Sequence, residues 1–464
     1  MFRGKIRSIH FTGIGGVSMG GIAEVLLAHG FEVSGSDLRE SEGTRRIAAQ
    51  GARIMVGHRA EQVKDADVVV FSSAVAKDNP ELLEARRLGV PVIPRAEMLA
   101  ELMRLQDGIA IAGTHGKTTT TSLTATVLRA AGLDPTVLIG GKLNILGSGA
   151  ARGEGRLLVA EADESDGSFL HLSPVISVIT NIDPEHLDHH GDHATLKDAF
   201  VAFANRVPFY GLVVACLDHP DVQDILPRID KRVTTYGLAT QADYCARDVK
   251  TEGLQTSFGL SVRGRDRGRL SLPMPGVHNV LNALATVAVA DELGVAPETS
   301  AEALSKFAGV QRRFTVLGSA AGVTVVDDYG HHPAEIEATL KAAEQAYRGR
   351  RLVVAFQPHR YSRTQNLFDE LSRSFNRADV LLLTDVHAGA GEVPIEGADA
   401  QSLGQAIAAH GHRDVSYVGE RAALIPQLLK RSHSGDIVIT LGAGSITATG
   451  PELLEALGAD PDRR

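Results

Sequence analysis

The stretch Gly113–Thr121, with the sequence GTHGKTTTT, constrains the fold more than any other part of the chain. It follows the apolar residues IAIA, so the pattern predicts a strand that passes through a glycine-rich turn into a helix. The backbone N–H groups of such a turn surround phosphate oxygens, Lys117 can reach the terminal phosphates, and the Thr118 hydroxyl can ligate Mg²⁺. The spacing of the two glycines departs from the common G-x-x-x-x-G-K-[ST] loop. Strand, loop, lysine, threonine and helix nevertheless coincide, which favours a phosphate-binding loop over an incidental turn.

The chain is too long for one hydrophobic core. Its 464 residues predict about two to four domains. Apolar content of 44% and charged content of 22% are ordinary for a soluble globular protein. The 48 glycines, together with many short runs of Val, Ile and Leu, favour an α/β fold.

The charge and the cysteines exclude several classes of protein. A net charge of −9 argues against a general nucleic-acid binder, which needs a basic face. Cys216 and Cys245 form no metal or redox motif and favour a reducing cytoplasm. No apolar run reaches the roughly 18 residues of a membrane-spanning helix, and the first residues lack the apolar region of a signal peptide. We therefore expect a cytoplasmic protein with no nucleic-acid and no membrane partner.

Three α/β units follow one another along the chain. Strand-like apolar runs alternate with helical stretches, which predicts mostly parallel sheets. We expect the units to span residues 1–107, 108–312 and 313–464. A polar, strand-like segment at 243–272 is typical of an antiparallel edge, and residues 275–294 carry the apolar stripe of a helix. The other expected elements are a helix at 17–29 and strands at 6–13, 31–37, 67–73, 90–94, 157–163, 175–182, 211–218, 323–330, 351–359, 380–386 and 436–445.

The acidic segment EADESD, Glu161–Asp166, follows the strand-like residues RLLVA. Acids at the carboxyl end of a strand lie where open α/β sheets bind ligands. Because Mg²⁺ prefers carboxylate, hydroxyl and phosphate oxygens, Glu161 is the predicted metal ligand and Asp163 a supporting acid. A solvated acidic loop is the alternative, which the neighbouring phosphate loop disfavours.

The segment TNIDPEHLDHH, Thr180–His190, ends another predicted strand of the second unit. His186 follows two acids and is a candidate for binding a second metal or orienting a phosphate. Histidine-rich loops are often merely exposed, and we expect this of His189 and His190.

The stretch GIGGVSMGG, Gly13–Gly21, follows the first predicted strand. With Asp37 at a suitable distance it approaches a dinucleotide fingerprint, but G-x-G-x-x-G would need glycine where Ser18 stands, so the signal for NAD is weak. The loop still presents backbone N–H groups at the start of a helix, which suit a diphosphate. A purely structural turn is the alternative.

Two segments of the third unit, VDDYGHHP and QPHRYSRT, lie at predicted strand ends. In the second of them, Arg360 and Arg363 are spaced so that both can face one carboxylate. A guanidinium binds a carboxylate by a planar, two-bond fork. The alternative is an exposed, charged helix start.

Together these motifs resemble those of the Mur ligases, the ATP-dependent amide-forming enzymes of peptidoglycan synthesis. The resemblance covers essentially the whole chain and rests on GIGGVSMGG, GTHGKTTTT, EADESDGSFLHL, PGVHNVLNA, VDDYGHHP and QPHRYSRT. It implies a Rossmann-like N-terminal domain that binds a UDP-sugar, a central P-loop ATPase domain with a mostly parallel sheet, and a Rossmann-like C-terminal domain that binds an amino acid. It is strongest for the branch that joins L-alanine to the lactyl carboxylate of UDP-N-acetylmuramate, using ATP and Mg²⁺ to form an acyl phosphate.

The resemblance also implies roles for individual residues. Those expected to bind ATP are Gly113, Thr114, His115, Gly116, Lys117, Thr118, Thr119, His278, Asn279, Asn282, Arg313 and Asp328. Those expected to ligate metal are Thr118, Glu161 and His186. The UDP-sugar is expected at Gly13, Gly15, Gly16, Ser18, Asp37 and Ser72, and the amino acid at Tyr329, His331, Arg360 and Arg363. The expected catalytic residues are Lys117, His186, Arg313 and His331, the last as an acceptor of the amine's proton.

The implied reaction brings a carboxylate to a triphosphate, so the site needs cations and must exclude water; domain closure is the expected means. Several Mur ligases use a carbamylated lysine after the metal-binding histidine. Here only Lys197 is near, at a spacing that does not match, so we do not predict carbamylation. The alternatives are a ligase that recycles whole peptides, a nucleotide-binding regulator and an NAD-dependent oxidoreductase. We expect a monomer or a homodimer.

Overall fold

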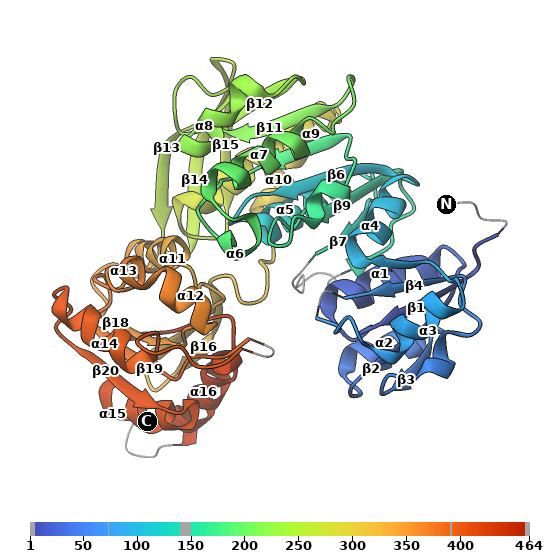
Figure 1. Ribbon diagram of the computed structural model, residues 1–464. Helices are drawn as coiled ribbons and strands as arrows, with labels where there is room; N and C mark the ends of the chain where they lie inside the picture. Colours follow the sequence, from blue (N-terminus) through green and yellow to red (C-terminus); the bar gives the residue numbers. More distant parts are fainter. Residues whose placement is uncertain (1–4, 73, 140–149, 390–391, 460–464) are drawn as a thin grey trace. The chain divides into compact units, whose positions relative to one another are not determined.

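The computed structural model describes residues 5–72, 74–139, 150–389 and 392–459. Within these residues the strands form three sheets, of five, ten and six strands (Figure 1). Each sheet is mostly parallel and carries helices between its strands, as the alternation of apolar runs and helical stretches predicts. None of the described helices is long and apolar enough to cross a membrane.

The N-terminal sheet is entirely parallel. Its strand order reverses between β1 and β4, and α/β sheets bind ligands in the crevice at such a reversal. The glycine-rich loop that follows β1 therefore lies at the expected position for a ligand. The strands in spatial order are β3 (Arg53–Val56), β2 (Glu32–Asp37), β1 (Ser8–Thr12), β4 (Val68–Phe71) and β5 (Val92–Pro94). The helices are α1 (Val17–Ala28), α2 (Glu42–Ala49), α3 (Pro80–Arg87) and α4 (Arg95–Met103).

The central sheet has β6 between β10 and β9, with all three parallel. Their carboxyl ends carry the phosphate loop, the segment that starts at Thr180 and the acidic segment, so three of the sequence motifs meet at one sheet edge. The strands in spatial order are β15 (Arg265–Leu272), β14 (Gln255–Val262), β13 (Tyr244–Glu252), β12 (Val233–Gly237), β11 (Leu212–Cys216), β10 (Ile176–Ile179), β6 (Asp107–Ala112), β9 (Leu157–Glu161), β7 (Thr136–Leu138) and β8 (Ala150–Ala151). The helices are α5 (Lys117–Ala130), α6 (Leu187–His190), α7 (His193–Ala204), α8 (Pro220–Ile225), α9 (Val277–Glu292) and α10 (Pro297–Ser305).

The edge formed by β13, β14 and β15 is polar, as its sequence predicts. Two-residue connections, 253–254 and 263–264, join these neighbouring strands. Only antiparallel strands can be joined so tightly. The last of them, β15, is exposed over most of its length.

The C-terminal sheet carries one antiparallel edge strand, β16; the pairings from β17 to β20 are parallel. One face packs on α11, α13 and α14, and the other packs on α15 and α16. The strands in spatial order are β16 (Thr315–Ala320), β17 (Val323–Asp328), β21 (Ile437–Leu441), β18 (Leu352–Phe356), β19 (Val380–Thr384) and β20 (Val415–Gly419). The helices are α11 (Pro333–Ala346), α12 (Tyr361–Asn366), α13 (Phe368–Leu371), α14 (Ala400–Ala409), α15 (Leu424–Arg431) and α16 (Thr449–Ala459).

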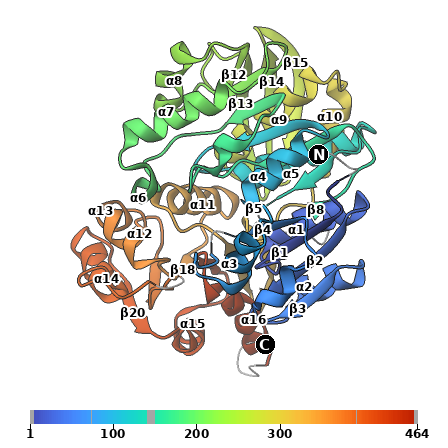
Figure 2. The ribbon, with the colours of Figure 1, turned by 45° about the vertical axis from the view of Figure 1, so that its right-hand side comes forward.

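The chain divides into two compact units. The first holds residues 1–248, 258–271 and 280–308, and the second holds residues 249–257, 272–279 and 309–464. In the first unit, one continuous apolar core joins the N-terminal sheet, through α1 and α4, to the central sheet. Figure 2 shows α1 beside β8 of the central sheet. The N-terminal and central α/β parts are thus packed as one body.

Candidate active site

The phosphate loop has the backbone that its glycines predict. Gly113 has φ +131°, and a Cβ there would lie 2.0 Å from Thr180 Oγ1. Gly116 has φ +83°, and a Cβ there would lie 2.7 Å from Asn282 Oδ1. Both positions therefore strongly favour glycine, because another residue would be strained in this conformation and its Cβ would displace a neighbouring side chain.

The loop is fastened to the segment that follows β10. The Thr180 hydroxyl donates to His115 O at 2.6 Å, and His115 N donates to Asn181 Oδ1 at 2.7 Å. Asp183 N donates to Thr114 Oγ1 at 2.9 Å. Asn282, on α9, accepts from Thr120 of α5 at 3.1 Å. The loop is thus held in shape from both sides, which leaves little ordering for a bound phosphate to induce.

Lys117 folds back over the loop. Its ammonium donates to Gly113 O at 2.6 Å, to Thr114 O at 3.2 Å and to both carboxylate oxygens of Glu164, at 2.9 and 2.8 Å. Burial alone would lower the pKa of Lys117, but the carboxylates of Glu164, Asp163 and Glu161 raise it. The lysine is therefore charged at neutral pH and positioned over the loop.

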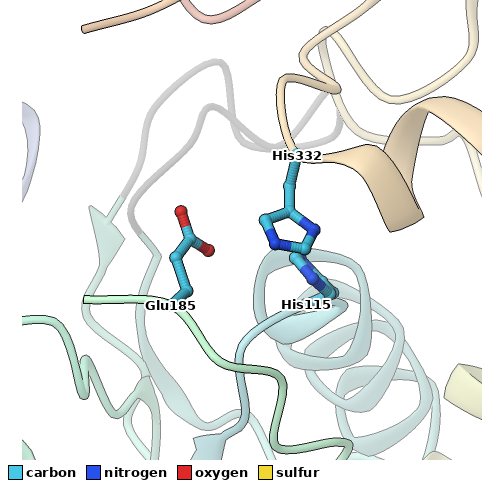
Figure 3. A group of neighbouring side chains, drawn as sticks. All are labelled: His115, Glu185 and His332. Atoms are coloured by element: carbon cyan, nitrogen blue, oxygen red, sulfur yellow. The ribbon is translucent and has the colours of Figure 1, made fainter. Parts of the chain in front are cut away.

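His115 and Asp183 connect the phosphate loop to the next strand end. His115 Nε2 lies 3.2 Å from one carboxylate oxygen of Asp183, and His219 Nε2 lies 3.3 Å from the other. Burial works against ionisation of Asp183, but the two histidines hold its pKa well below the usual range. Figure 3 shows His115 on the phosphate loop and Glu185 on the segment after β10, and also His332, which caps α11 in the second unit.

The segment after β10 contains a strained residue at a predicted site. His186 has φ +58° and ψ +31°, a left-handed conformation that costs a residue other than glycine about 1 kcal/mol or more. Such strain concentrates at functional positions. His189 is exposed, as expected, but His190 is buried and bonds through Nε2 to Glu164 O at 2.8 Å. The prediction that His190 is a surface residue is therefore wrong, because it anchors the acidic segment.

Lys197 lies in the environment of an ordinary ammonium. Its Nζ is 3.1 Å from a carboxylate oxygen of Asp221 and 3.1 Å from one of Asp224. A carbamate at this position would place a third negative group beside two carboxylates. Carbamylation of Lys197 is therefore not proposed.

The glycine-rich loop of the N-terminal sheet is braced by an acid. Gly15 N donates to Asp37 Oδ2 at 2.8 Å, and Ser72, after β4, lies against Gly13. Asp37 therefore holds the loop that a diphosphate would use. Beneath the same sheet edge, the fully buried Glu81 accepts from the hydroxyls of Thr12 and Ser36, both at 2.7 Å.

A cavity in the first unit connects this loop with the acidic segment. Arg95, the first residue of α4, lines it, and the guanidinium lies 4.0 Å from a carboxylate oxygen of Asp163. The cavity brings the predicted sugar residue Ser18 and the predicted metal ligand Glu161 to the walls of one space. The lining residues are Ser18, Gly21, Ile22, Arg95, Leu99, Leu138, Ile139, Glu161 and Asp163.

In the second unit, Arg313 joins a buried group of predicted nucleotide residues. Arg313 Nη1 lies 3.3 Å from Glu335 Oε1, and its guanidinium lies 5.2 Å from the ring centre of Tyr329. Burial, with Arg313 nearby, lowers the pKa of His278 to about 4. Asp328 accepts from Phe314 N and from Gly330 N, both at 2.7 Å, and burial raises its pKa to about 6 in spite of Arg313.

Three histidines follow the carboxyl ends of β17, β18 and β19 in the C-terminal sheet. The rings of His331 and His359 are 5.8 Å apart, and those of His359 and His387 are stacked at 5.6 Å. Arg363 Nη1 lies 3.1 Å from His359 Nδ1. Burial and the neighbouring cations lower the pKa of His359 to about 3, so the ring is neutral and Nδ1 accepts from the guanidinium. Arg360, the N-cap residue before α12, has φ +68° and thus a strained backbone.

Glu392 holds the two loops of this site together. Its Oε1 accepts from Ser362 N at 2.9 Å and from Ser362 Oγ at 2.6 Å. Its Oε2 accepts from Tyr361 N and from Gly389 N, both at 3.0 Å. Burial opposes ionisation, but these donors lower the pKa of Glu392 to about 2.

Three consecutive parts of the chain match domains of one family. Residues 8–107 match the Mur ligase family catalytic domain, residues 111–290 the Mur ligase middle domain, and residues 312–444 the Mur ligase glutamate ligase domain. The chain belongs to the Mur ligase family. The three-domain α/β fold expected for a Mur ligase is thereby confirmed.

Comparisons with individual proteins show which Mur ligases this chain is similar to. The chain is 62% identical to a UDP-N-acetylmuramate–L-alanine ligase of Sorangium cellulosum, over 97% of this chain and 96% of that protein. Its fold matches the crystal structure of UDP-N-acetylmuramate-alanine ligase MurC from Thermotoga maritima, with a TM-score of 0.80, 29% identity and coverage of 97% and 98% of the two chains. A murein peptide ligase from Psychrobacter arcticus matches with a TM-score of 0.70, 25% identity and coverage of 98% and 99%.

Several residues of the candidate site were missed from the sequence. Arg95 follows the predicted strand at 90–94, so its place at a strand's carboxyl end was a usable signal. Glu164 belongs to a motif that was found, but the choice among its acids depends on the turn geometry. His359, His387 and Glu392 carry no local pattern and become meaningful only once strands β18 and β19 are known to be neighbours.

Proposed function

We propose that this Mur ligase joins L-alanine to the lactyl carboxylate of UDP-N-acetylmuramate, with conversion of ATP to ADP and phosphate. The observation that carries the proposal is the 62% identity to an alanine ligase over nearly the full length of both proteins. The structure supports it through a preformed phosphate loop, a cavity that joins this sheet edge to the N-terminal glycine loop, and a cationic site on the C-terminal sheet. The product belongs to peptidoglycan precursor synthesis, in the cytoplasm, by a monomer or a homodimer.

The ATP phosphates bind the loop from Gly113 to Thr119. Its N–H groups and Lys117 face the phosphate oxygens, and the N-terminus of α5 adds a favourable field. Thr118 and Glu161 offer the hydroxyl and carboxylate oxygens that Mg²⁺ prefers, from neighbouring strand ends, with His186 as a further donor. Mg²⁺ bound there supplies charge neutralisation to the phosphate oxygens.

The carboxylate to be activated lies in the cavity of the first unit. The UDP part of the substrate occupies the glycine loop braced by Asp37, and the cavity leads from Ser18 towards the acidic segment. Arg95 is the cation in this wall that can offset repulsion between a carboxylate and the triphosphate. A carboxylate oxygen then attacks the γ-phosphorus, ADP leaves, and an acyl phosphate forms.

L-Alanine binds at the carboxyl ends of β17, β18 and β19. Arg360 and Arg363 hold its carboxylate, and neutral His359 orients Arg363. The amine attacks the acyl carbonyl and phosphate leaves. His331, beside His359, accepts the proton that the amine loses.

The test is a phosphate-release assay with purified protein, ATP, Mg²⁺ and UDP-N-acetylmuramate. Each of the twenty amino acids, and the peptide that a recycling ligase would attach, is added in turn. Release that depends on both the UDP-sugar and alanine supports the proposal. Release with the peptide but not with alanine would assign the chain to the peptide-recycling branch, and binding of ATP without any release would favour a regulator.

A further inference from the structure

The lysine of the phosphate loop has a buried carboxylate as its partner. Both oxygens of Glu164 lie within 2.9 Å of Lys117 Nζ. The side chain of Glu164 is 2% exposed and that of Lys117 is 16% exposed. A charge buried to this degree is costly unless it is paired, so each group requires the other or a substitute.

The acidic segment holds Glu164 rigidly in this position. Gly167 N donates to Glu164 O at 3.1 Å, with Gly167 in a left-handed conformation. The ring of His190 bonds to the same carbonyl oxygen at 2.8 Å. Two independent contacts thus fix the backbone of Glu164, and its side chain is directed at the ammonium rather than at solvent.

The same ammonium is the group that a bound nucleotide needs. Lys117 and the N–H groups around it lie at the N-terminus of α5, where phosphate oxygens bind. A carboxylate and a phosphate of a nucleotide carry the same sign and compete for one ammonium. The two loop carbonyls bonded to Lys117 are neutral and do not compete in this way.

We propose that Glu164 is a positioning residue that stands in for the nucleotide phosphates: it holds Lys117 over the phosphate loop before ATP binds and is displaced from the ammonium when ATP binds. This inference rests on the proposed function only in taking ATP as the nucleotide. Glu164 therefore keeps Lys117 in position and, by competing with the phosphates, lowers the affinity for nucleotide. It is distinct from Glu161, the predicted metal ligand at the end of β9.

The test measures nucleotide affinity by calorimetry on the full chain without UDP-sugar or alanine, so its outcome does not depend on ligase activity. Glu164→Gln removes the competing charge and nearly preserves the shape. In EDTA, where no metal contributes, the variant is expected to bind ADP and ATP roughly tenfold more tightly or better. Damage to the loop would weaken binding, so a gain in affinity separates competition from a merely structural role.

Two controls make the result specific. Asp166→Asn removes a charge from the same segment at an exposed position and keeps the acceptor for Ser168 N, so affinity should not change. In a Lys117→Ala background, the gain from Glu164→Gln should vanish. Equal or weaker nucleotide binding by Glu164→Gln in EDTA would overturn the proposal. If nucleotide binding were weaker only when Mg²⁺ is present, Glu164 would instead be a metal ligand, which would also overturn it. If Glu164→Gln fails to fold, Glu164→Asp, whose shorter side chain loosens the pair, should bind nucleotide more tightly than the unmodified protein, and equal or weaker binding would again overturn it.

Discussion

Replacement of Glu392 by glutamine should impair use of alanine far more than use of ATP. The carboxylate accepts four hydrogen bonds, two on each oxygen: three come from Tyr361 and Ser362 at the start of α12, and one comes from Gly389 N. Glutamine keeps one oxygen and carries no charge. With its amide nitrogen towards Ser362, it loses the bond from Ser362 N, the Ser362 hydroxyl turns to accept, and the remaining bonds are no longer charge-assisted. The lost bond costs about 1.5 kcal/mol and the weakening of the other three adds a similar amount, so the loss is about 3 kcal/mol. If half of it falls on the ordering of α12, the KM for alanine rises about tenfold.

The assay is steady-state phosphate release with alanine and ATP varied separately, beside thermal unfolding. Glu396→Gln is the matched control, because Glu396 is an exposed acid of the same loop and should leave both KM values unchanged. A Glu392→Gln enzyme with a lowered Tm but an alanine KM within about twofold of normal would contradict this prediction. It would show that Glu392 stabilises the fold without positioning the amino-acid site.

Three further predictions concern Lys117, Arg363 and His359. Lys117→Ala should lower kcat by about two to three orders of magnitude with an unchanged far-ultraviolet circular dichroism spectrum, and near-normal turnover would remove the phosphate-loop assignment. Arg363→Lys keeps the charge but loses the fork, so the alanine KM should rise roughly tenfold or more while that for ATP changes little; the reverse pattern would place Arg363 in the nucleotide site. His359, with a pKa of about 3 when folded and 6.5 when unfolded, should make folding less stable by about 2 kcal/mol at pH 5 than at pH 8, because only the unfolded chain takes up its proton in that range. Urea unfolding of His359→Asn at both pH values should show that much less pH dependence, and an identical dependence would mean that His359 is not neutral.

The strands were largely predictable because buried parallel strands are apolar throughout. The run predicted at 67–73 is β4 (Val68–Phe71), and that at 351–359 is β18 (Leu352–Phe356). Elements without such a run were missed. The strands β16 and β3 contain only exposed and half-buried residues, so neither has the continuous apolar run of a buried strand. The helices α2 and α3 are short and rich in charged residues, so they contain too few apolar residues for a helical periodicity to be recognised in the sequence.

The site shows the same division between local and long-range information. Gly113 and Lys117 could be identified because a phosphate loop is a local pattern with a local mechanism. Glu164 could not be singled out from Glu161, because both lie in one acidic run and only the turn at Gly167 decides which faces the ammonium. His190 was misjudged for a related reason, since its partner is a carbonyl oxygen 26 residues away.

Activation of the carboxylate as an acyl phosphate, before the amine attacks, can be followed by the transfer of an isotope. UDP-N-acetylmuramate labelled with ¹⁸O in both lactyl carboxylate oxygens is converted in the presence of ATP, Mg²⁺ and L-alanine, and the released phosphate is analysed by mass spectrometry. If an acyl phosphate forms, each released phosphate should carry one ¹⁸O atom and the new amide should carry the other. Phosphate without label, or label in AMP, would contradict it.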